Sequence, residues 1–170
     1  MKKVLLIAAI GFASLSASAQ TEKGKTKFGI ALEAGIPTGD AGDVYSVALG
    51  GSLLLEHPVA SSLNLTGSAG YTNFSVKDEW KDFGVESAGF IPVKAGAKYY
   101  FAKNFYAQGE LGAAFGAKKG YDTQFIWTPG LGLSYPVSDK TDFDAGVRYE
   151  SWSANGGSID QIAFRVALKF

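Results

Sequence analysis

The sequence predicts an all-β protein, a closed eight-stranded antiparallel up-and-down transmembrane β-barrel, and three observations lead to this fold class. An alternation with a period of two residues runs through eight segments, one phase of it carries no charged side chain, and the other phase carries eleven. Successive side chains of a strand point to opposite faces, so each phase is one face of a strand. An Arg or Lys on the lipid face near the bilayer midplane costs roughly 2 to 4 kcal/mol, which explains an uncharged face.

The eight segments follow one another with short gaps. They are residues 28–36, 44–56, 63–74, 90–101, 105–116, 124–136, 142–152 and 161–170. The uncharged face of the first segment reads Phe28, Ile30, Leu32, Ala34 and Ile36. The charged residues of the opposite face are Glu33, Glu56, Lys94, Lys98, Glu110, Asp142, Asp144, Arg148, Glu150, Arg165 and Lys169, and Gly and Ala dominate the rest of that face.

The connections between these segments alternate in character. Residues 57–62, 102–104 and 137–141 are compact and turn-like, whereas the other connections are rich in Gly or charge. In bacterial transmembrane barrels the short turns lie on the periplasmic side and the longer loops lie outside. Both ends of the predicted barrel therefore face the periplasm.

The first 19 residues have the features of a cleaved signal peptide. Lys2 and Lys3 precede an apolar stretch from Val4 to Phe12, and Ala17-Ser18-Ala19 forms a cleavage site before Gln20. A single-pass anchor is the competing interpretation, but the stretch is shorter than the roughly 20 residues that a spanning helix needs. We expect a signal peptide at 1–19, a flexible leader at 20–27 and the barrel at 28–170.

The composition excludes several function classes. Cleavage removes Lys2 and Lys3, so the sixteen basic residues become fourteen against sixteen acidic ones, a net charge of about −2. This charge predicts no nucleic-acid partner. The chain has no cysteine and one histidine, which excludes disulfides, thiolate metal sites and His-cluster metal sites. We predict no metal, no cofactor and no catalytic residue.

Two weak chemical patterns remain. His57 could form a catalytic pair with Ser61 or Ser62, as in a lipid-modifying enzyme, but no supporting motif accompanies it, and an ordinary turn residue is the favoured interpretation. Asp142 and Asp144 lie two residues apart on one face and could form an acid pair or a cation site. A charge cluster at the periplasmic rim is the favoured interpretation of this pair.

A soluble ligand carrier of the lipocalin type also alternates, with bulky apolar residues inside and charges outside. The small residues between the charges suit a narrow lumen better than a surface in water. Inside an eight-stranded barrel side chains fill the lumen, so we predict a packed network of charges there. Its members are Glu33, Lys94, Lys98, Glu110, Asp144, Arg148, Glu150 and Arg165. The alternative is a polar path for conduction.

The hairpin through Lys103 sets a register that predicts particular pairs. Lys98 faces Gln108 and Gly96 faces Glu110, which gives Glu110 the diagonal neighbours Lys94 and Lys98. If the first and last strands close the barrel, Glu33 and Arg165 meet near its middle.

Two prolines conflict with a regular barrel. Pro129 lies within a predicted strand, where no free edge accommodates its missing N–H, so we expect a bulge or a local break. Pro92 raises the same problem, and the faces assigned to Phe90 and Ile91 could change by one residue.

Aromatic residues of the uncharged face gather toward both strand ends, as interfacial girdles do. Toward the periplasm these are Phe28, Phe101, Phe105, Tyr135, Phe143 and Phe170, and toward the other side they are Tyr45, Tyr71, Phe115, Phe125, Trp127 and Tyr149. The longest and most charged connection, residues 77–87, carries Trp80 and Phe83. It is the candidate surface-contact loop, and the alternative is a solvated loop whose aromatic residues sit at headgroup level.

The chain ends in Ile162-Ala163-Phe164-Arg165-Val166-Ala167-Leu168-Lys169-Phe170. With the signal peptide and eight strands, it resembles the small outer-membrane barrels of the OmpA/OmpX type and the broad outer membrane protein beta-barrel domain family. The resemblance implies that Phe164, Val166, Leu168 and Phe170 form the assembly signal read by the barrel-assembly machinery. It also implies the bacterial outer membrane as location and outer-membrane lipid as partner, without the wall anchoring of full-length OmpA-type proteins.

We therefore expect a non-enzymatic outer-membrane protein with a structural or surface-interaction role in the envelope. The alternatives are a narrow porin-like passage for small or hydrophobic solutes, similar to OmpW-like barrels, and a lipid-modifying enzyme. No surface ligand is identified by the sequence, because one scaffold carries many functions in such a family.

Overall fold

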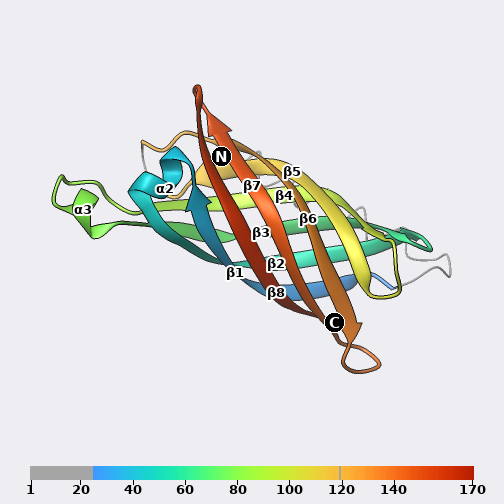
Figure 1. The fold of residues 1–170 in the computed structure, drawn as a ribbon. Helices are drawn as coiled ribbons and strands as arrows, with labels where there is room; N and C mark the ends of the chain where they lie inside the picture. Colours follow the sequence, from blue (N-terminus) through green and yellow to red (C-terminus); the bar gives the residue numbers. More distant parts are fainter. Residues whose placement is uncertain (1–24, 119) are drawn as a thin grey trace.

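The structure is a computed structural model that describes residues 25–118 and 120–170, and in it eight antiparallel strands close into a barrel (Figure 1). The strands are β1 (Lys27–Thr38), β2 (Tyr45–Ala60), β3 (Leu63–Val76), β4 (Ala88–Tyr100), β5 (Phe105–Gly116), β6 (Gln124–Pro136), β7 (Asp142–Ala154) and β8 (Gly157–Lys169). The predicted fold class is confirmed. Lys27, which was predicted to belong to the leader, is the first residue of β1, and the predicted signal peptide lies outside the described residues.

Each strand pairs with its neighbours in sequence, and β1 pairs with β8 to close the barrel. Two short helices, α2 (Asp40–Val44) and α3 (Asp78–Lys81), lie between β1 and β2 and between β3 and β4. Neither helix of the described residues has the length and apolar character required to cross a bilayer.

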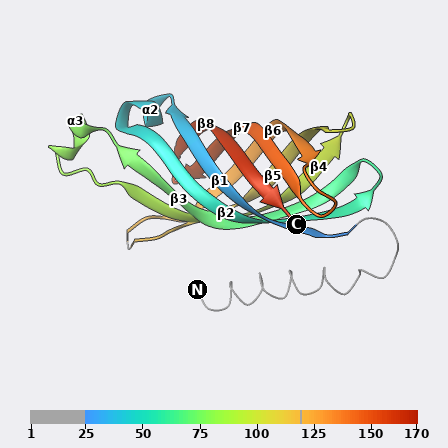
Figure 2. The same ribbon diagram turned by 90° about the horizontal axis from the view of Figure 1, so that it is seen from below.

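The two ends of the barrel differ, and we call them the loop end and the turn end. The loop end holds α2, α3 and the connections from β5 to β6 and from β7 to β8, and the turn end holds the three compact turns, the start of β1 and the end of β8 (Figures 1 and 2). The last connection at the loop end is tighter than expected. Asn155 and Gly156 both have positive φ, 47° and 84°, which is the geometry of a two-residue type I′ hairpin, so β7 and β8 extend toward the hairpin.

The alternation of faces follows the prediction along most of the barrel. In β8 every second residue from Gln161 to Lys169 is buried, and Ile162, Phe164, Val166 and Leu168 between them are exposed. The apolar side chains of the outward face are exposed in the isolated chain, as Leu32 at 70% illustrates. An apolar wall of this extent requires an apolar environment around it.

Tyr45 is the clear exception among the predicted outward aromatic residues. The pairing of β2 with β3 shifts between Tyr45 and Val47, which is an irregularity of the β-bulge kind, and it changes the face to which the end of β2 points. Tyr45 consequently packs inside against Phe74, with ring centroids 5.6 Å apart. The assignment of Tyr45 to the outer girdle was wrong. Leu55, also of the outward phase, is buried.

Each proline interrupts the pairing of its own strand with one neighbouring strand, and the register is the same on both sides of the interruption. β6 pairs with β7 from Phe125 to Trp127 and again from Gly130, with no pair at Thr128 or Pro129 and the same register on both sides. The ladder of β4 with β3 likewise has no pair at Pro92 and Ile91. Each proline keeps its pair on β5, so the missing N–H faces the other neighbour. The break expected at Pro129 is present, and the change of faces considered for Phe90 and Ile91 does not occur, since Phe90 is buried and Ile91 is exposed.

Candidate functional site

The lumen is filled by three layers, and the layer nearest the loop end is an apolar plug. Six strands contribute its buried residues, which are Ala48, Phe74, Ala88, Phe90, Ala114, Ile126 and Trp152. Phe74 contacts Trp152 edge-on with ring centroids 5.2 Å apart, and Phe90 contacts Trp152 at 5.6 Å. These inward aromatic residues were not recognised in the sequence, because the inner phase was characterised by its charges and its small residues.

Below the plug lies a closed ring of six alternating charges, the six-charge ring. Its members in order are Glu33, Arg148, Glu150, Lys94, Glu110 and Arg165, which returns to Glu33. The two arginines contact Glu33 at 2.7 and 3.0 Å, and the longest link, between Lys94 Nζ and Glu110 Oε2, is 3.9 Å. Three acids and three bases give the ring no net charge. It is joined to the plug by Trp152 Nε1, which donates to Glu150.

Nearer the turn end lies a second closed ring, the four-charge ring. Lys98 and Lys169 each contact both Glu56 and Asp144, at distances from 2.8 to 3.1 Å. Tyr106 donates to Asp144, and Tyr100 donates to Glu56. The Lys98 ammonium also lies 4.0 Å from the centre of the Tyr106 ring, a cation–π contact.

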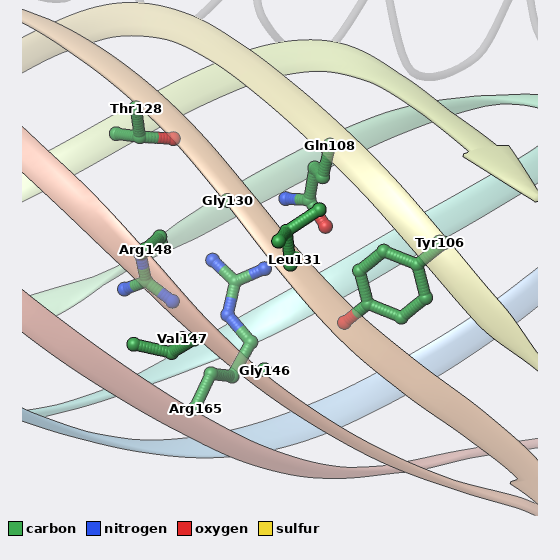
Figure 3. A pocket seen from close by; sticks show the side chains of 9 residues that line it. All are labelled: Tyr106, Gln108, Thr128, Gly130, Leu131, Gly146, Val147, Arg148 and Arg165. Atoms are coloured by element: carbon green, nitrogen blue, oxygen red, sulfur yellow. The ribbon is translucent and has the colours of Figure 1, made fainter.

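The two rings satisfy the condition under which buried charge is tolerated, because every charge has a partner of opposite sign. Ser52 donates to Glu33, and Gln161 donates to Glu150, so carboxylate oxygens also receive neutral donors. A cavity beside Arg148 and Arg165 has a volume of about 10 Å³, the size of one water molecule (Figure 3). The side chains of the plug and the two rings therefore fill the lumen.

All eight residues predicted for the lumen network lie in one of these rings. The register predicted from the hairpin is present, with Lys98 opposite Gln108 and Gly96 opposite Glu110. Glu33 and Arg165 are register partners and form an ion pair. Lys98, however, contacts Glu56 and Asp144 across the lumen rather than the diagonal neighbour Glu110.

Two members of the four-charge ring, Glu56 and Lys169, were on the predicted inner face but were not assigned to the network. Their place follows from the closure of the barrel: Lys169 on β8 reaches Asp144 on the adjacent strand β7 and, across β1, Glu56 on β2. The two aspartates considered as an acid pair have separate partners. Asp142 contacts Lys27 at the rim of the turn end, and Asp144 belongs to the four-charge ring.

His57 lies near the turn end of β2, and its Nδ1 is 2.8 Å from Thr26 Oγ1. In the described residues this contact, rather than one with Ser61 or Ser62, is the side-chain hydrogen bond of His57. No group of three or more His, Cys, Asp or Glu in this part of the chain is arranged to hold a metal ion.

The candidate surface-contact loop is folded and attached to its neighbour. Trp80 Nε1 donates to the carbonyl of Asp43, and the backbone N–H of Lys77 donates to Val44. The rings of Trp80 and Phe83 lie 6.2 Å apart, and Phe83 is 83% exposed. An exposed aromatic pair on a fixed loop is therefore presented beyond the loop end.

A model of the family described as "Outer membrane protein beta-barrel domain" matches residues 5–170 of this chain. The chain belongs to this outer-membrane β-barrel family. The comparison with curated proteins gave no match. Several solved structures share the fold at low sequence identity.

Three of these structures illustrate the likeness. The N-terminal β-barrel domain of Pseudomonas aeruginosa OprF has a TM-score of 0.54 and 12% identity, covering 87% of this chain and 100% of its own. Ail of Yersinia pestis, in a phospholipid nanodisc, has a TM-score of 0.53 and 16% identity, covering 86% and 100%. A de novo designed transmembrane β-barrel has a TM-score of 0.52 and 15% identity, covering 88% and 100%.

As an outer-membrane barrel, the chain meets lipid with its outward apolar wall. Phe101 and Phe105 stack at the turn end with centroids 6.5 Å apart, and Trp127 and Tyr149 contact each other at 5.5 Å toward the loop end. The last strand also closes the barrel, since Phe28 and Phe170 exchange two backbone hydrogen bonds of 3.1 and 2.7 Å. Phe164, Val166, Leu168 and Phe170 are all exposed on the lipid-facing wall.

Proposed function

We propose that this outer-membrane barrel is a non-conducting envelope protein that serves as a rigid scaffold and presents the loop 77–87 for surface interaction. The observation that carries the proposal is the filled lumen: an apolar plug, the six-charge ring and the four-charge ring follow one another along its axis. A hydrated ion needs a continuous polar path, and the three layers packed by the described residues, with a cavity of about 10 Å³ beside Arg148 and Arg165, argue against one.

The proposal includes an orientation and a route of biogenesis. Residues 1–19 act as a cleaved signal peptide, the turn end faces the periplasm and the loop end faces outward. Phe164, Val166, Leu168 and Phe170 serve as the assembly signal for the barrel-assembly machinery. Their common exposed face along β8, the strand that closes the barrel, and at Phe170 directly after it supports this role.

The surface role is supported by the arrangement of Trp80 and Phe83. Aromatic side chains are frequent energetic centres of protein interfaces, and binding is tighter when they are held in place before the partner arrives. The hydrogen bond from Trp80 to Asp43 fixes the position of the loop before any partner binds.

Conductance in a planar bilayer tests the closed lumen. We expect no single-channel steps from the purified, folded protein at voltages at which a porin conducts. Reproducible steps of uniform size would contradict the proposal and favour the narrow solute passage.

A complementation experiment tests the two proposed roles separately. A strain lacking the protein is supplied with the wild type or with a Trp80→Ala/Phe83→Ala variant, and both detergent sensitivity and attachment to surfaces are measured. We expect the variant to restore detergent resistance but not attachment. Full attachment by the variant would remove this loop as the contact surface.

A further inference from the structure

An open groove of about 460 Å³ lies on the outside of the barrel wall, beneath the loop 77–87. Its position follows from the sequence of the outward face. Along β3 this face changes from Leu65 and Tyr71 to the polar Asn73, and along β4 it changes from Ile91 to Gly89. The groove therefore begins where the apolar wall ends, which is the depth of the lipid headgroups.

Several hydrogen-bond donors from different elements converge on this groove. Lys81 comes from α3, Lys118 from the connection after β5, and Tyr71 and Asn73 from β3. The position of Tyr71 depends on a glycine, because a Cβ at Gly89 would lie 2.4 Å from the Tyr71 hydroxyl. The absence of a side chain at Gly89 gives the phenol room beside the groove.

Glu86 is the one carboxylate among the described residues that line the groove, and it contacts Lys118 at 2.8 Å. Glu86 is charged at neutral pH, and the hydrogen bond from Lys118 lowers the pKa of this carboxyl further. Both side chains of this pair are more than half exposed, and an ion pair of this kind contributes little to stability. Lys118 can therefore exchange Glu86 for another anion at small cost.

We propose that this groove binds the phosphate of a membrane lipid headgroup, held by Lys81 and Lys118. Each lysine already has an exposed carboxylate partner, Asp78 for Lys81 and Glu86 for Lys118, with which the phosphate competes. A lipid fits better than a free anion because the groove opens directly onto the apolar wall, where Tyr71 and Ile91 can contact the acyl chains. Basic groups at headgroup depth are the usual recognition elements for anionic lipid.

The competition by Glu86 gives the proposal a distinctive test. Native mass spectrometry of the detergent-solubilised protein compares phosphatidic acid with diacylglycerol of the same chains and with inorganic phosphate. We expect phosphatidic acid to be retained preferentially, Lys118→Gln to weaken its binding about fivefold, and Glu86→Gln to strengthen it by a similar factor. Lys103→Gln, the same charge change at the turn end, is the matched control and should have no effect.

Opposite effects of Lys118→Gln and Glu86→Gln on lipid binding distinguish this site from a purely structural ion pair. If Glu86 and Lys118 only tied two loops together, both substitutions would act in the same direction. The proposal is overturned by that result, by equal retention of phosphatidic acid and diacylglycerol, by an equal effect of Lys103→Gln, or by inorganic phosphate binding as well as the lipid. Each variant is first checked for folding by its mobility difference between heated and unheated gel samples.

Discussion

Glu33 is the residue on which both arginines of the six-charge ring converge. Its two carboxylate oxygens contact Arg148 and Arg165 separately, and Ser52 donates to it as well. Neither arginine is free to turn toward solvent, because both side chains are buried in the lumen. Loss of the Glu33 charge would therefore leave the ring with a buried net positive charge.

We expect Glu33→Gln to lower the free energy of unfolding by about 3 kcal/mol or more, since removing one partner leaves buried positive charge without compensation. The measurement is the urea midpoint of the unfolding transition in detergent. The control is Asp142→Asn, which breaks the partly exposed pair with Lys27 and should cost less than about 1 kcal/mol. Equal losses in the two variants would show that the ring is not desolvated as the structure implies.

A substitution at Leu49 tests whether the outward wall contacts lipid. It is 55% exposed in the isolated chain and points toward lipid. We expect Leu49→Arg to destabilise the inserted barrel by about 2 to 4 kcal/mol, and Phe83→Arg, the same charge gain in the loop 77–87, to be tolerated. The yield of heat-modifiable protein in the membrane fraction measures both. Similar yields from both variants would mean that the outward face does not contact hydrocarbon.

The sequence predicted the ion-pair partners of some residues but not of others. Alternation placed Glu33 and Arg165 on the inner face, and adjacency of the terminal strands made them partners. The partners of Lys98 were not predictable in this way, because they lie on β2 and β7, across the lumen. Such contacts depend on barrel radius and strand stagger, which no local pattern contains.

At the scale of strands, extent and register follow from turn chemistry and from the alternation. β5 and β6 begin and end at the predicted residues, and the compact turn at Lys103 fixes the pairing of β4 with β5. The bulge near Tyr45 was not predicted, since the apolar character of Tyr45 fits either face. Against the plug, the Tyr45 ring is stabilised by Phe74, and this tertiary contact decides its direction.

The ladder break at Pro129 leads to a prediction for β6 and β7. Pro129→Ala restores an N–H on the side facing β7, so we expect slower hydrogen exchange at Tyr149 to Ser151. Global stability should change by less than about 1 kcal/mol, because a gained hydrogen bond and the lost rigidity of proline in the unfolded chain oppose each other. Exchange is followed by mass spectrometry. Ile126→Val, nearby but within the paired segment, is the control, and unchanged exchange in Pro129→Ala would contradict the assigned direction of the missing N–H.

At the scale of the whole molecule, the three layers act as barriers in series. The order along β4, with Phe90, Lys94 and Lys98 at every second inward position, places the plug nearest the loop end and the four-charge ring nearest the turn end. Each ring has its own ion pairs and no net charge. A defect in the plug therefore leaves both rings with all their partners of opposite charge.

This independence predicts that opening the plug does not open the barrel. Trp152→Ala should lower the free energy of unfolding by about 3 to 5 kcal/mol, as expected for a large buried aromatic residue, and yet show no single-channel current. Combining Trp152→Ala with Glu33→Gln should still give no current, because the four-charge ring keeps all its ion pairs. Current should appear only when Glu56→Gln is added, which leaves net charge in that ring as well. Planar-bilayer recordings of Trp152→Ala, the double variant and the triple variant measure this. Current through Trp152→Ala alone would show that the plug is the only barrier and that the rings do not seal the lumen.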